Sequence, residues 1–532
     1  VDMSSTLTVA GVLTGASLDI SGDIDVDGTT NLDVVDVDGA ANFAGDVTFA
    51  TGADILTASA GDDNVRIGLD AGDSIASGGN RNIVIGRNAG TAITTGDSNV
   101  AIGWEALKTE DAHGNNVAIG ASALSLQNAG ADGYNVGIGY NAGSAVTTGI
   151  LNTIVGGLAG DANTTGTRNV ALGYLALSGN TTASNNTAVG ASALLANTTG
   201  ASNTAVGKAA LSTNITGANN TAIGLQSLAN AVGSNNTAVG MNALVITTSG
   251  ADNTAIGHLA MQENTTGASN TAVGKKALFN NTNAANNTAV GFESGLSTTT
   301  GAQNTFFGRK AGRGNTTGTE NTFVGNSAGR DGTTTGSHNV GLGTGVLNTL
   351  TSGNNNIGIG RDALGAVTTV NNLTAVGYQS LTSNTTGTNG VAVGKDALQA
   401  NTTGDNNTAI GLEALQTNTT GDSLTAVGTG ALASNTTANN NSAFGRSAGG
   451  AITTGVENTL IGSLAGDALT SSADNTAVGY QALGSATTGN ENTAIGHSAL
   501  FTNILSDRNV ALGVDALRNH NQASSIDSYN TA

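Results

Sequence analysis

Residues 186–202 read NTAVGASALLANTTGAS, and nearly everything after residue 60 is a variation on these 17 residues. The glycine of NTAVG recurs 27 times, first as Gly68 and last as Gly513, with spacings that differ from 17 by only one or two residues. A short period repeated this often predicts a solenoid, in which each repeat forms one coil and neighbouring coils share a core. We number the repeat positions 1 to 17 from the asparagine of NTAVG, so that the recurring glycine is position 5.

The composition agrees with one long array rather than several globular domains. The 532 residues include 79 Gly, no Pro and no Cys. Disordered chains are also poor in aromatic residues, but here Val, Ile and Leu recur at fixed positions, which disorder does not require. The formal net charge of −20 argues against a nucleic-acid-binding protein, which needs a basic surface. The lack of Cys excludes disulfides and Cys-ligated metals, and no run of 18 apolar residues predicts a membrane span.

Residues 1–60 differ from the array and are predicted to form a strand-rich shaft or connector. Apolar and acidic residues alternate there, for example in 24–27, as in strands with one buried face. Residues 23–28, DIDVDG, also match the opening of a calcium-binding loop, but Val34 stands where its closing glutamate would be. We therefore interpret the acidic residues as the exposed face of strands. The array spans residues 61–532 and stops part-way into a repeat, so we expect the natural protein to continue.

Each repeat is predicted to form one coil of a β-solenoid. Positions 1–4 read as a short strand, position 5 as a bend, positions 6–10 as a second extended piece, and NTTG as the turn back. Asn, Thr and Gly are poor helix formers, and no helical apolar stripe is present. The predicted fold class is all-β: a parallel β-solenoid, or β-roll, of about 27 coils. At ~4.8 Å per coil the rod would be about 130 Å long.

Positions 3 and 9 vary together. Leu or Met occupies position 9 in 18 repeats, all with Ala or Gly at position 3. The other nine repeats have Gly at position 9, and five of these have a large residue at position 3: Val84, Ile154, Phe306, Phe323 and Leu460. A sixth enlarges the neighbouring position instead (Ala443, Phe444), and three are exceptions: Arg66, Gly137 and Ala289. Because cores tolerate exchanges that conserve volume, the two positions are predicted to share one interior.

Position 4 is nearly always Val, Ile, Leu or Phe, although it points away from position 3 in a strand. A strand that is apolar on both sides is buried on both sides. One side faces the interior of the coil, and the simplest cover for the other is an identical chain. A lone solenoid would leave a long apolar stripe in water, which soluble monomers avoid. We therefore expect a homo-oligomer.

Stacked polar residues are predicted to form ladders along the rod. Asn recurs at positions 1 and 12, and Thr at positions 13 and 14. Identical side chains stacked one coil apart can each hydrogen-bond to the next coil.

The motif NTAVG or NVAIG, followed by x-x-A-L, resembles the head repeats of trimeric autotransporter adhesins of the YadA type. The resemblance covers residues 64–532 and implies a trimeric, left-handed parallel β-roll, with the extra residues here enlarging the NTTG turn. Residues 1–60, with DIDVDGTTNLDVVDVDGA, look like shaft segments of tail-fibre proteins from marine bacteriophages, which often carry NTAVG arrays. Neither the chaperone domain of such fibres nor the stalk and anchor of the adhesins is visible. We prefer the phage-fibre interpretation, which implies a homotrimer with chains intertwined or side by side.

No catalytic, cofactor or metal site is predicted. The five histidines are scattered over some twenty coils, and none lies in an H-x-x-H or H-E-x-x-H spacing. No phosphate-binding G-x-x-x-x-G-K-[ST] motif is present. A nucleophile, a base and an orienting group gathered in one place are therefore not indicated, and we expect no enzymatic activity.

Position 6 is the one position that suggests binding. It holds the only Trp, four of the six Tyr and seven of the 17 basic residues. Its aromatic, basic and imidazole residues are Arg87, Trp104, Tyr140, Tyr174, Lys208, His258, Lys275, Phe292, Arg309, Arg361, Tyr378, Lys395, Arg446, Tyr480 and His497. Because the residues at position 6 are so variable and so often polar, we expect this position to be exposed. It is either a stripe for glycans or anionic cell surfaces, since Tyr and Trp offer flat contact area at low entropic cost, or an exposed position that simply tolerates large residues.

Three functions remain open. The first is a structural fibre of a phage-like particle, attached to other virion proteins through residues 1–60, which extends a receptor-binding end and grips host glycans along its side. The second is a bacterial cell-surface trimeric adhesin of the same fold. The third is an ice-binding solenoid, suggested by the threonines of position 13 (Thr198, Thr265, Thr385, Thr402). The first two place the protein on a virion or in the extracellular space, with a glycan or protein receptor as partner and no nucleic acid.

Overall fold

The computed structural model describes residues 60–520 and 529–532. The chain divides into two compact units, Val1–Ile55 and Leu56–Ala532, and the repeat array belongs to the second. The predicted strands of the N-terminal segment, and the calcium-loop alternative at residues 23–28, lie outside the described residues.

The described part of the array is a parallel β-solenoid without helices, as predicted, and so contains no helix long and apolar enough to cross a membrane. It contains 27 strands of three residues, each formed by positions 2–4 of one repeat. The strands are β1 Val65–Ile67, β2 Ile83–Ile85, β3 Val100–Ile102, β4 Val117–Ile119, β5 Val136–Ile138, β6 Thr153–Val155, β7 Val170–Leu172, β8 Thr187–Val189, β9 Thr204–Val206, β10 Thr221–Ile223, β11 Thr237–Val239, β12 Thr254–Ile256, β13 Thr271–Val273, β14 Thr288–Val290, β15 Thr305–Phe307, β16 Thr322–Val324, β17 Val340–Leu342, β18 Ile357–Ile359, β19 Thr374–Val376, β20 Val391–Val393, β21 Thr408–Ile410, β22 Thr425–Val427, β23 Ser442–Phe444, β24 Thr459–Ile461, β25 Thr476–Val478, β26 Thr493–Ile495 and β27 Val510–Leu512.

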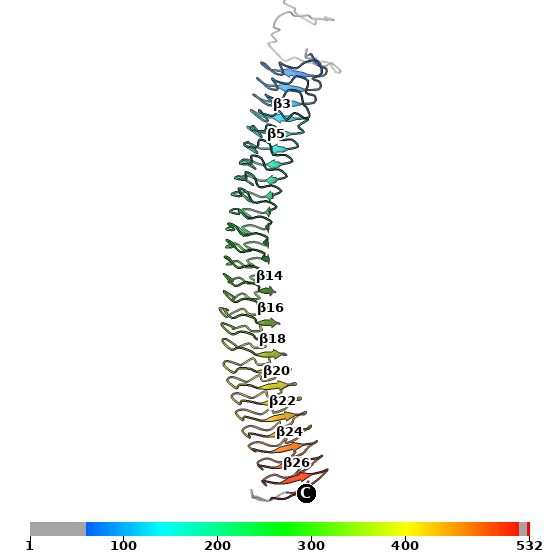
Figure 1. Ribbon diagram of the computed structural model, residues 1–532, viewed down its shortest axis with the longest axis vertical. Helices are drawn as coiled ribbons and strands as arrows, with labels where there is room; N and C mark the ends of the chain where they lie inside the picture. Colours follow the sequence, from blue (N-terminus) through cyan, green and yellow to red (C-terminus); the bar gives the residue numbers. More distant parts are fainter. Residues whose placement is uncertain (1–59, 521–528) are drawn as a thin grey trace, which may run out of the picture. The chain divides into compact units, whose positions relative to one another are not determined.

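Each strand pairs in parallel with the next strand in the chain, so the coils stack in sequence order (Figure 1). Equivalent positions pair with one another: Ala188 pairs with Ala205, and Ala205 with Ala222. At the far end Val510 pairs with Thr531, which begins the next coil in the same register. This register places every repeat position in a column that runs along the array.

The second half of each coil is a turn and not the extended piece that we expected. Positions 7 and 9 adopt left-handed backbone conformations, as in Ser192 (φ 58°) and Leu194 (φ 51°). Left-handed residues reverse the chain and cannot lie in a strand. β-Branched side chains are strongly disfavoured there, which explains why position 9 is Leu, Met or Gly and never Val or Ile. The sequence pattern at position 9 therefore reflects backbone conformation as well as packing.

Position 5 requires glycine for two reasons. Gly190 has φ 129°, a conformation that other residues rarely adopt, and a Cβ added to it would lie 2.7 Å from the carbonyl carbon of Gly207 in the next coil.

We expect Gly190→Ala to destabilise the array by at least about 2 kcal/mol, because the backbone strain and the clash with the next coil add together. Thermal unfolding followed by circular dichroism measures the loss. Gly157→Ala, at an open position 6 where an added Cβ meets only Tyr174 Cδ2 at 3.7 Å, is the control and should be nearly neutral.

Positions 3 and 9 share one interior, as predicted, and position 8, which the sequence analysis did not identify, lies in it as well. Ala188, Ala193 and Leu194 are fully buried, as are their equivalents in almost every described coil. Phe306 and Phe323, from adjacent coils, stack in this interior with their ring centroids 5.9 Å apart.

A bulky apolar residue at position 3 needs two position-9 glycines, one in its own coil and one in the coil before. Cβ atoms added to Gly160 and Gly143 would lie 3.2 and 2.9 Å from Cδ1 of Ile154, which sits between them. The other bulky residues follow the same rule: Val84, Phe306, Phe323 and Leu460. The first coil of each run of glycines therefore has no bulky apolar residue of its own, which accounts for every departure from the predicted exchange: Arg66, Gly137, Ala289 and Ala443. Phe444, which we expected to compensate beside Ala443, instead faces outward and is 42% exposed.

The predicted asparagine ladders are present at positions 1 and 12. At position 1, the side-chain oxygen of Asn186 accepts a hydrogen bond of 2.9 Å from the backbone N–H of Asn203, and this contact recurs along most of the array. At position 12, the amide of Asn197 donates to Oδ1 of Asn180 at 3.1 Å. At position 13 the hydroxyl of Thr198 donates to the carbonyl of Ile215 in the next coil. Buried amides stacked in this way satisfy one another and fix the register of the coils.

Position 4 faces outward along the whole sheet. None of its 27 residues is buried in the single chain, and eleven are more than a third exposed: Ile67, Leu172, Ile223, Ile256, Phe307, Val393, Ile410, Phe444, Ile461, Ile495 and Leu512. We call these 27 side chains the outward sheet face. It is the long apolar stripe that the sequence predicted for an uncovered solenoid.

Candidate functional site

The position-6 residues lie on the surface beside the outward sheet face, one residue beyond the position-5 bend. Of the fifteen that the sequence singled out, fourteen are exposed and His258 is half-buried. Tyr140 and Tyr174 are the most exposed of the aromatic members, at 61% and 58%. The predicted exposure of this stripe is confirmed, and its role in binding stays a prediction.

In three places an aromatic member of the stripe contacts a cation or an imidazole of the adjacent coil. Tyr480 and His497 stack with their ring centroids 5.3 Å apart. The guanidinium of Arg361 lies 5.5 Å from the centre of the Tyr378 ring, and that of Arg309 lies 6.0 Å from the Phe292 ring. Such cation–π contacts hold the long arginine side chains against the surface. Distant members such as Arg87 and Tyr480 belong to different regions of the array and do not form one site.

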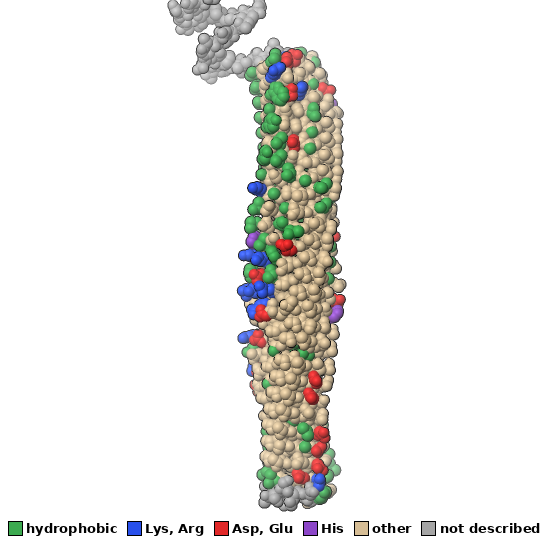
Figure 2. Space-filling model, turned by 90° about the vertical axis from the view of Figure 1, so that its left-hand side faces the viewer, with side chains coloured by type: hydrophobic (Ala, Val, Ile, Leu, Met, Phe, Trp, Pro, Cys, Tyr) green, Lys and Arg blue, Asp and Glu red, His purple; other side chains and the backbone are tan. Residues whose placement is uncertain are grey.

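Cationic side chains gather along one flank of the middle coils (Figure 2), although the chain as a whole is acidic. Nine of the 17 Lys and Arg residues fall between residues 200 and 400, all at positions 6, 7 or 10, which share that flank: Lys208, Lys275, Lys276, Arg309, Lys310, Arg313, Arg330, Arg361 and Lys395. Some have carboxylate partners; for example, Glu293 lies 3.0 Å from Arg313 and 4.0 Å from Lys310. Lys208, Lys275 and Arg309 form no ion pair with any described residue, so their charge remains available to an anion.

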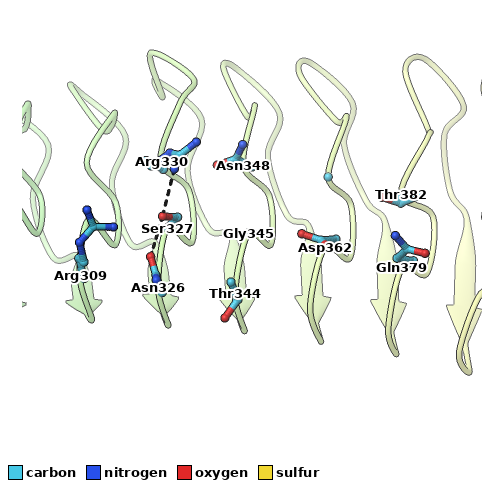
Figure 3. A pocket seen from close by; sticks show the side chains of 11 residues that line it. Arg309, Asn326, Ser327, Arg330, Thr344, Gly345, Asn348, Asp362, Gln379 and Thr382 are labelled. Atoms are coloured by element: carbon cyan, nitrogen blue, oxygen red, sulfur yellow. Dashed lines mark hydrogen bonds between the residues drawn. The ribbon is translucent and has the colours of Figure 1, made fainter.

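A polar groove of about 490 Å³ opens on this flank across five coils, from β15 to β19 (Figure 3). Its lining comes from positions 6, 7 and 10: Arg309, Asn326, Ser327, Arg330, Thr344, Gly345, Asn348, Asp362, Gly365, Gln379 and Thr382. The groove exists because small residues replace larger ones at these positions, above all Thr344, Gly345 and Gly365. Arg309 at one end and Gln379 at the other keep long side chains and bound the hollow.

The groove is lined by fixed hydrogen-bonding groups. The Arg330 guanidinium donates to Asp331 through Nε at 2.6 Å and to Ser327 Oγ through Nη1 at 3.3 Å. Asn348 donates to the same Asp331 carboxylate at 2.8 Å. The hydrogen bond from Arg330 is the main cause that lowers the pKa of the Asp331 carboxyl, so this pair stays charged. Asn348 Oδ1 is buried and has no hydrogen-bond partner among the described residues.

The sequence analysis identified Arg309 but missed the rest of the groove, because it looked for large residues at position 6. Small residues at these positions are the signal that could have found the groove. Asn326 and Thr344 at position 6 of successive coils, with Gly345 at position 7, predict a local hollow. Convergent amides, hydroxyls and guanidinium groups in a shallow hollow suit a hydroxyl-rich, negatively charged ligand better than an apolar one.

No protein-family model matches the chain, and no curated protein matches it either.

Proposed function

We propose that this chain is the rod of a homotrimeric surface fibre, and we favour a tail fibre of a phage-like particle. The rod would bind acidic host-surface glycans along one flank. The observation that carries the proposal is the outward sheet face, which is apolar in all 27 coils and uncovered in the single chain. Contiguous apolar patches of this length mark sites of protein association.

The outward sheet face fits a second copy of the same chain better than an unrelated partner. Its residues repeat at every coil with the same spacing, so an identical array can match it coil by coil. A long interface of matching register also explains why large apolar side chains such as Phe307 and Phe444 are kept in an exposed column. A parallel assembly of chains leaves the cationic flank of every copy in the same orientation along the fibre.

The glycan-binding part of the proposal rests on the groove and the unpaired cations beside it. Arg309 lines the groove and has no carboxylate partner among the described residues, while Arg330 is held by Asp331 in a fixed orientation. A bacterial trimeric adhesin of the same fold would use the same surfaces and remains the alternative. The ice-binding alternative is weaker, because the position-13 hydroxyls, such as that of Thr198, donate to carbonyls of the next coil.

Charges placed on the outward sheet face should break the assembly without unfolding the coils. We expect the triple variant Leu172→Lys, Val189→Lys, Val206→Lys to sediment as a smaller species than the wild type, because three positive charges would be buried in every chain contact. Analytical ultracentrifugation measures the change, and circular dichroism checks the fold. The matched control puts the same charges at position 14 of the same coils, which is exposed: Thr182→Lys, Thr199→Lys, Thr216→Lys. Equal sedimentation of the two variants would refute this placement of the interface.

Loss of Arg309 should weaken glycan binding. We expect Arg309→Gln to lower the affinity for sialylated or sulfated glycans by about tenfold, since a charged hydrogen bond contributes roughly 1.5–3 kcal/mol. A glycan array selects the ligand, and titration calorimetry measures the affinity of wild type and variant. Arg168→Gln is the control, because Arg168 is exposed at position 17, away from the groove. Unchanged binding by Arg309→Gln would remove the groove from the proposal.

A further inference from the structure

The turn of the third coil contains a buried carboxylate that no hydrogen bond satisfies. Glu110 is fully buried, and neither of its carboxylate oxygens has a hydrogen-bond partner among the described residues. Nδ1 of His113 is likewise buried without a hydrogen bond, and it lies 3.8 Å from Glu110 Oε1. Removing a carboxylate from water without a hydrogen-bond partner is costly.

Glu110 is the one acidic residue in position 12 of the described coils. Position 12 is Asn in many coils, and within a run of such coils the amide of one Asn donates to the side-chain oxygen of the Asn before it, as Asn180 does to Asn163 at 2.8 Å. A carboxylate can only accept, and the equivalent residue of the preceding coil is Ile93, which cannot donate. In the following coil, Gln127 Oε1 accepts a hydrogen bond from Asn135 Nδ2, and Gln127 Nε2 makes no hydrogen bond. The carboxylate therefore lacks the hydrogen bonds that stacked asparagines give one another, and the charged group that faces it is His113, which is positive only when it is protonated.

Burial is the main cause that raises the pKa of Glu110 to about 7, and nearby negative charges of Asp111 and Asp132 act in the same direction. The backbone N–H groups of His113 and Asp111 oppose the shift but do not reach hydrogen-bonding geometry with the carboxylate.

Three potential ligand atoms converge in this turn. Glu110, Asp111 and His113 each offer one, and these atoms all lie within 4.8 Å of one another. Among the residues that the structure describes, no other group of three has this property. One imidazole nitrogen with two carboxylate oxygens suits Zn²⁺ or Mn²⁺, whereas Ca²⁺ and Mg²⁺ prefer oxygen ligands alone.

The surroundings leave a route for an ion. The His113 side chain is 30% exposed, and Asp111 is partly exposed. The following coil is two residues longer than the usual repeat, and a Cβ added at Gly130 in its turn would meet no atom within 4 Å. His113 also stands at position 15, where glycine is usual, so the two departures from the repeat pattern, Glu110 and His113, occur together.

We propose that the turn formed by residues 110–113 binds one divalent transition-metal ion per chain, through the carboxylates of Glu110 and Asp111 and Nδ1 of His113, with water completing the coordination. The ion neutralises the buried carboxylate and ties the turn of the third coil together. The site departs from our expectation of no metal site, and it is independent of the proposed function.

The test is titration calorimetry of chelator-treated full-length protein with ZnCl₂ and with MnCl₂. We expect one site per chain for at least one of the two ions. Glu110→Asn and His113→Gln should each weaken binding at least about tenfold, as loss of a ligand or of its support does. Glu110→Asn restores the residue of the other coils and should keep the circular dichroism of the wild type, so that a loss of binding is not a loss of fold.

The matched control is His338→Gln. His338 lies 3.2 Å from Glu320, but that pair is about half exposed and has no third ligand, so this variant should bind like the wild type. Equal binding by all variants would show surface association only and overturn the proposal. Absence of binding by the wild type, with an infrared band of a protonated carboxylic acid that disappears in Glu110→Asn, would show that a proton and not a metal satisfies Glu110.

Discussion

Leu194→Asp is expected to unfold the coils around it. Leu194 is fully buried at position 9, and its left-handed backbone suits Asp, so the substitution tests the environment of the side chain and not the backbone. An unpaired carboxylate in this interior should cost on the order of 5 kcal/mol, at the upper end of single-residue effects. Thermal unfolding and soluble yield measure the loss.

Thr199→Asp is the control for this substitution, because Thr199 lies five residues further along the same coil and is exposed. It should leave the unfolding transition nearly unchanged. A Leu194→Asp protein as stable as this control would contradict the assignment of position 9 to the core.

The second large effect concerns the two-glycine rule for bulky core residues. The double variant Leu177→Gly, Leu194→Gly should lose about 5 kcal/mol, because two buried leucines leave cavities while the glycines relieve some left-handed strain. Adding Ala188→Ile should recover roughly half of that loss, since it recreates the arrangement of Gly143, Ile154 and Gly160. Chemical denaturation of the three proteins measures both steps.

A bulky residue with only one glycine is the control. Leu194→Gly with Ala188→Ile should be no more stable than Leu194→Gly alone, because Leu177 of the preceding coil still occupies the space that the larger side chain would need. Full rescue by this pair would show that the exchange takes place within one coil, as the sequence suggested.

The solenoid, its register and its core positions could be predicted because each is repeated 27 times. Three predicted features belong to a repeat position and not to a single residue: the exchange between positions 3 and 9, the asparagine ladders and the exposure of position 6. Each is visible in many coils, so a few exceptions do not hide it. The conformation of positions 6–10 was predicted wrongly, because Leu194 and its equivalents have no sequence signal for a left-handed backbone. Leu is not a residue type that favours this conformation.

The features that sequence reasoning missed are breaks in the columns. The groove arises from small residues such as Thr344 and Gly345, and the carboxylate cluster from Glu110 and His113 in place of Asn and Gly. A search for what each column shares passes over such single departures. Which of these residues face one hollow depends on how neighbouring coils are stacked, including the two-residue insertion after Glu110, and only the coordinates provide that.

The assembly of chains over the outward sheet face is the central claim, and the molar mass in solution tests it most directly. Multi-angle light scattering on residues 1–532 should give three times the chain mass of 51.7 kDa, and this mass should persist on dilution to the micromolar range. A mass of one chain, for protein with the circular dichroism of a folded β-solenoid, would contradict the account, because the apolar side chains of all 27 coils would then be stable in water without a partner.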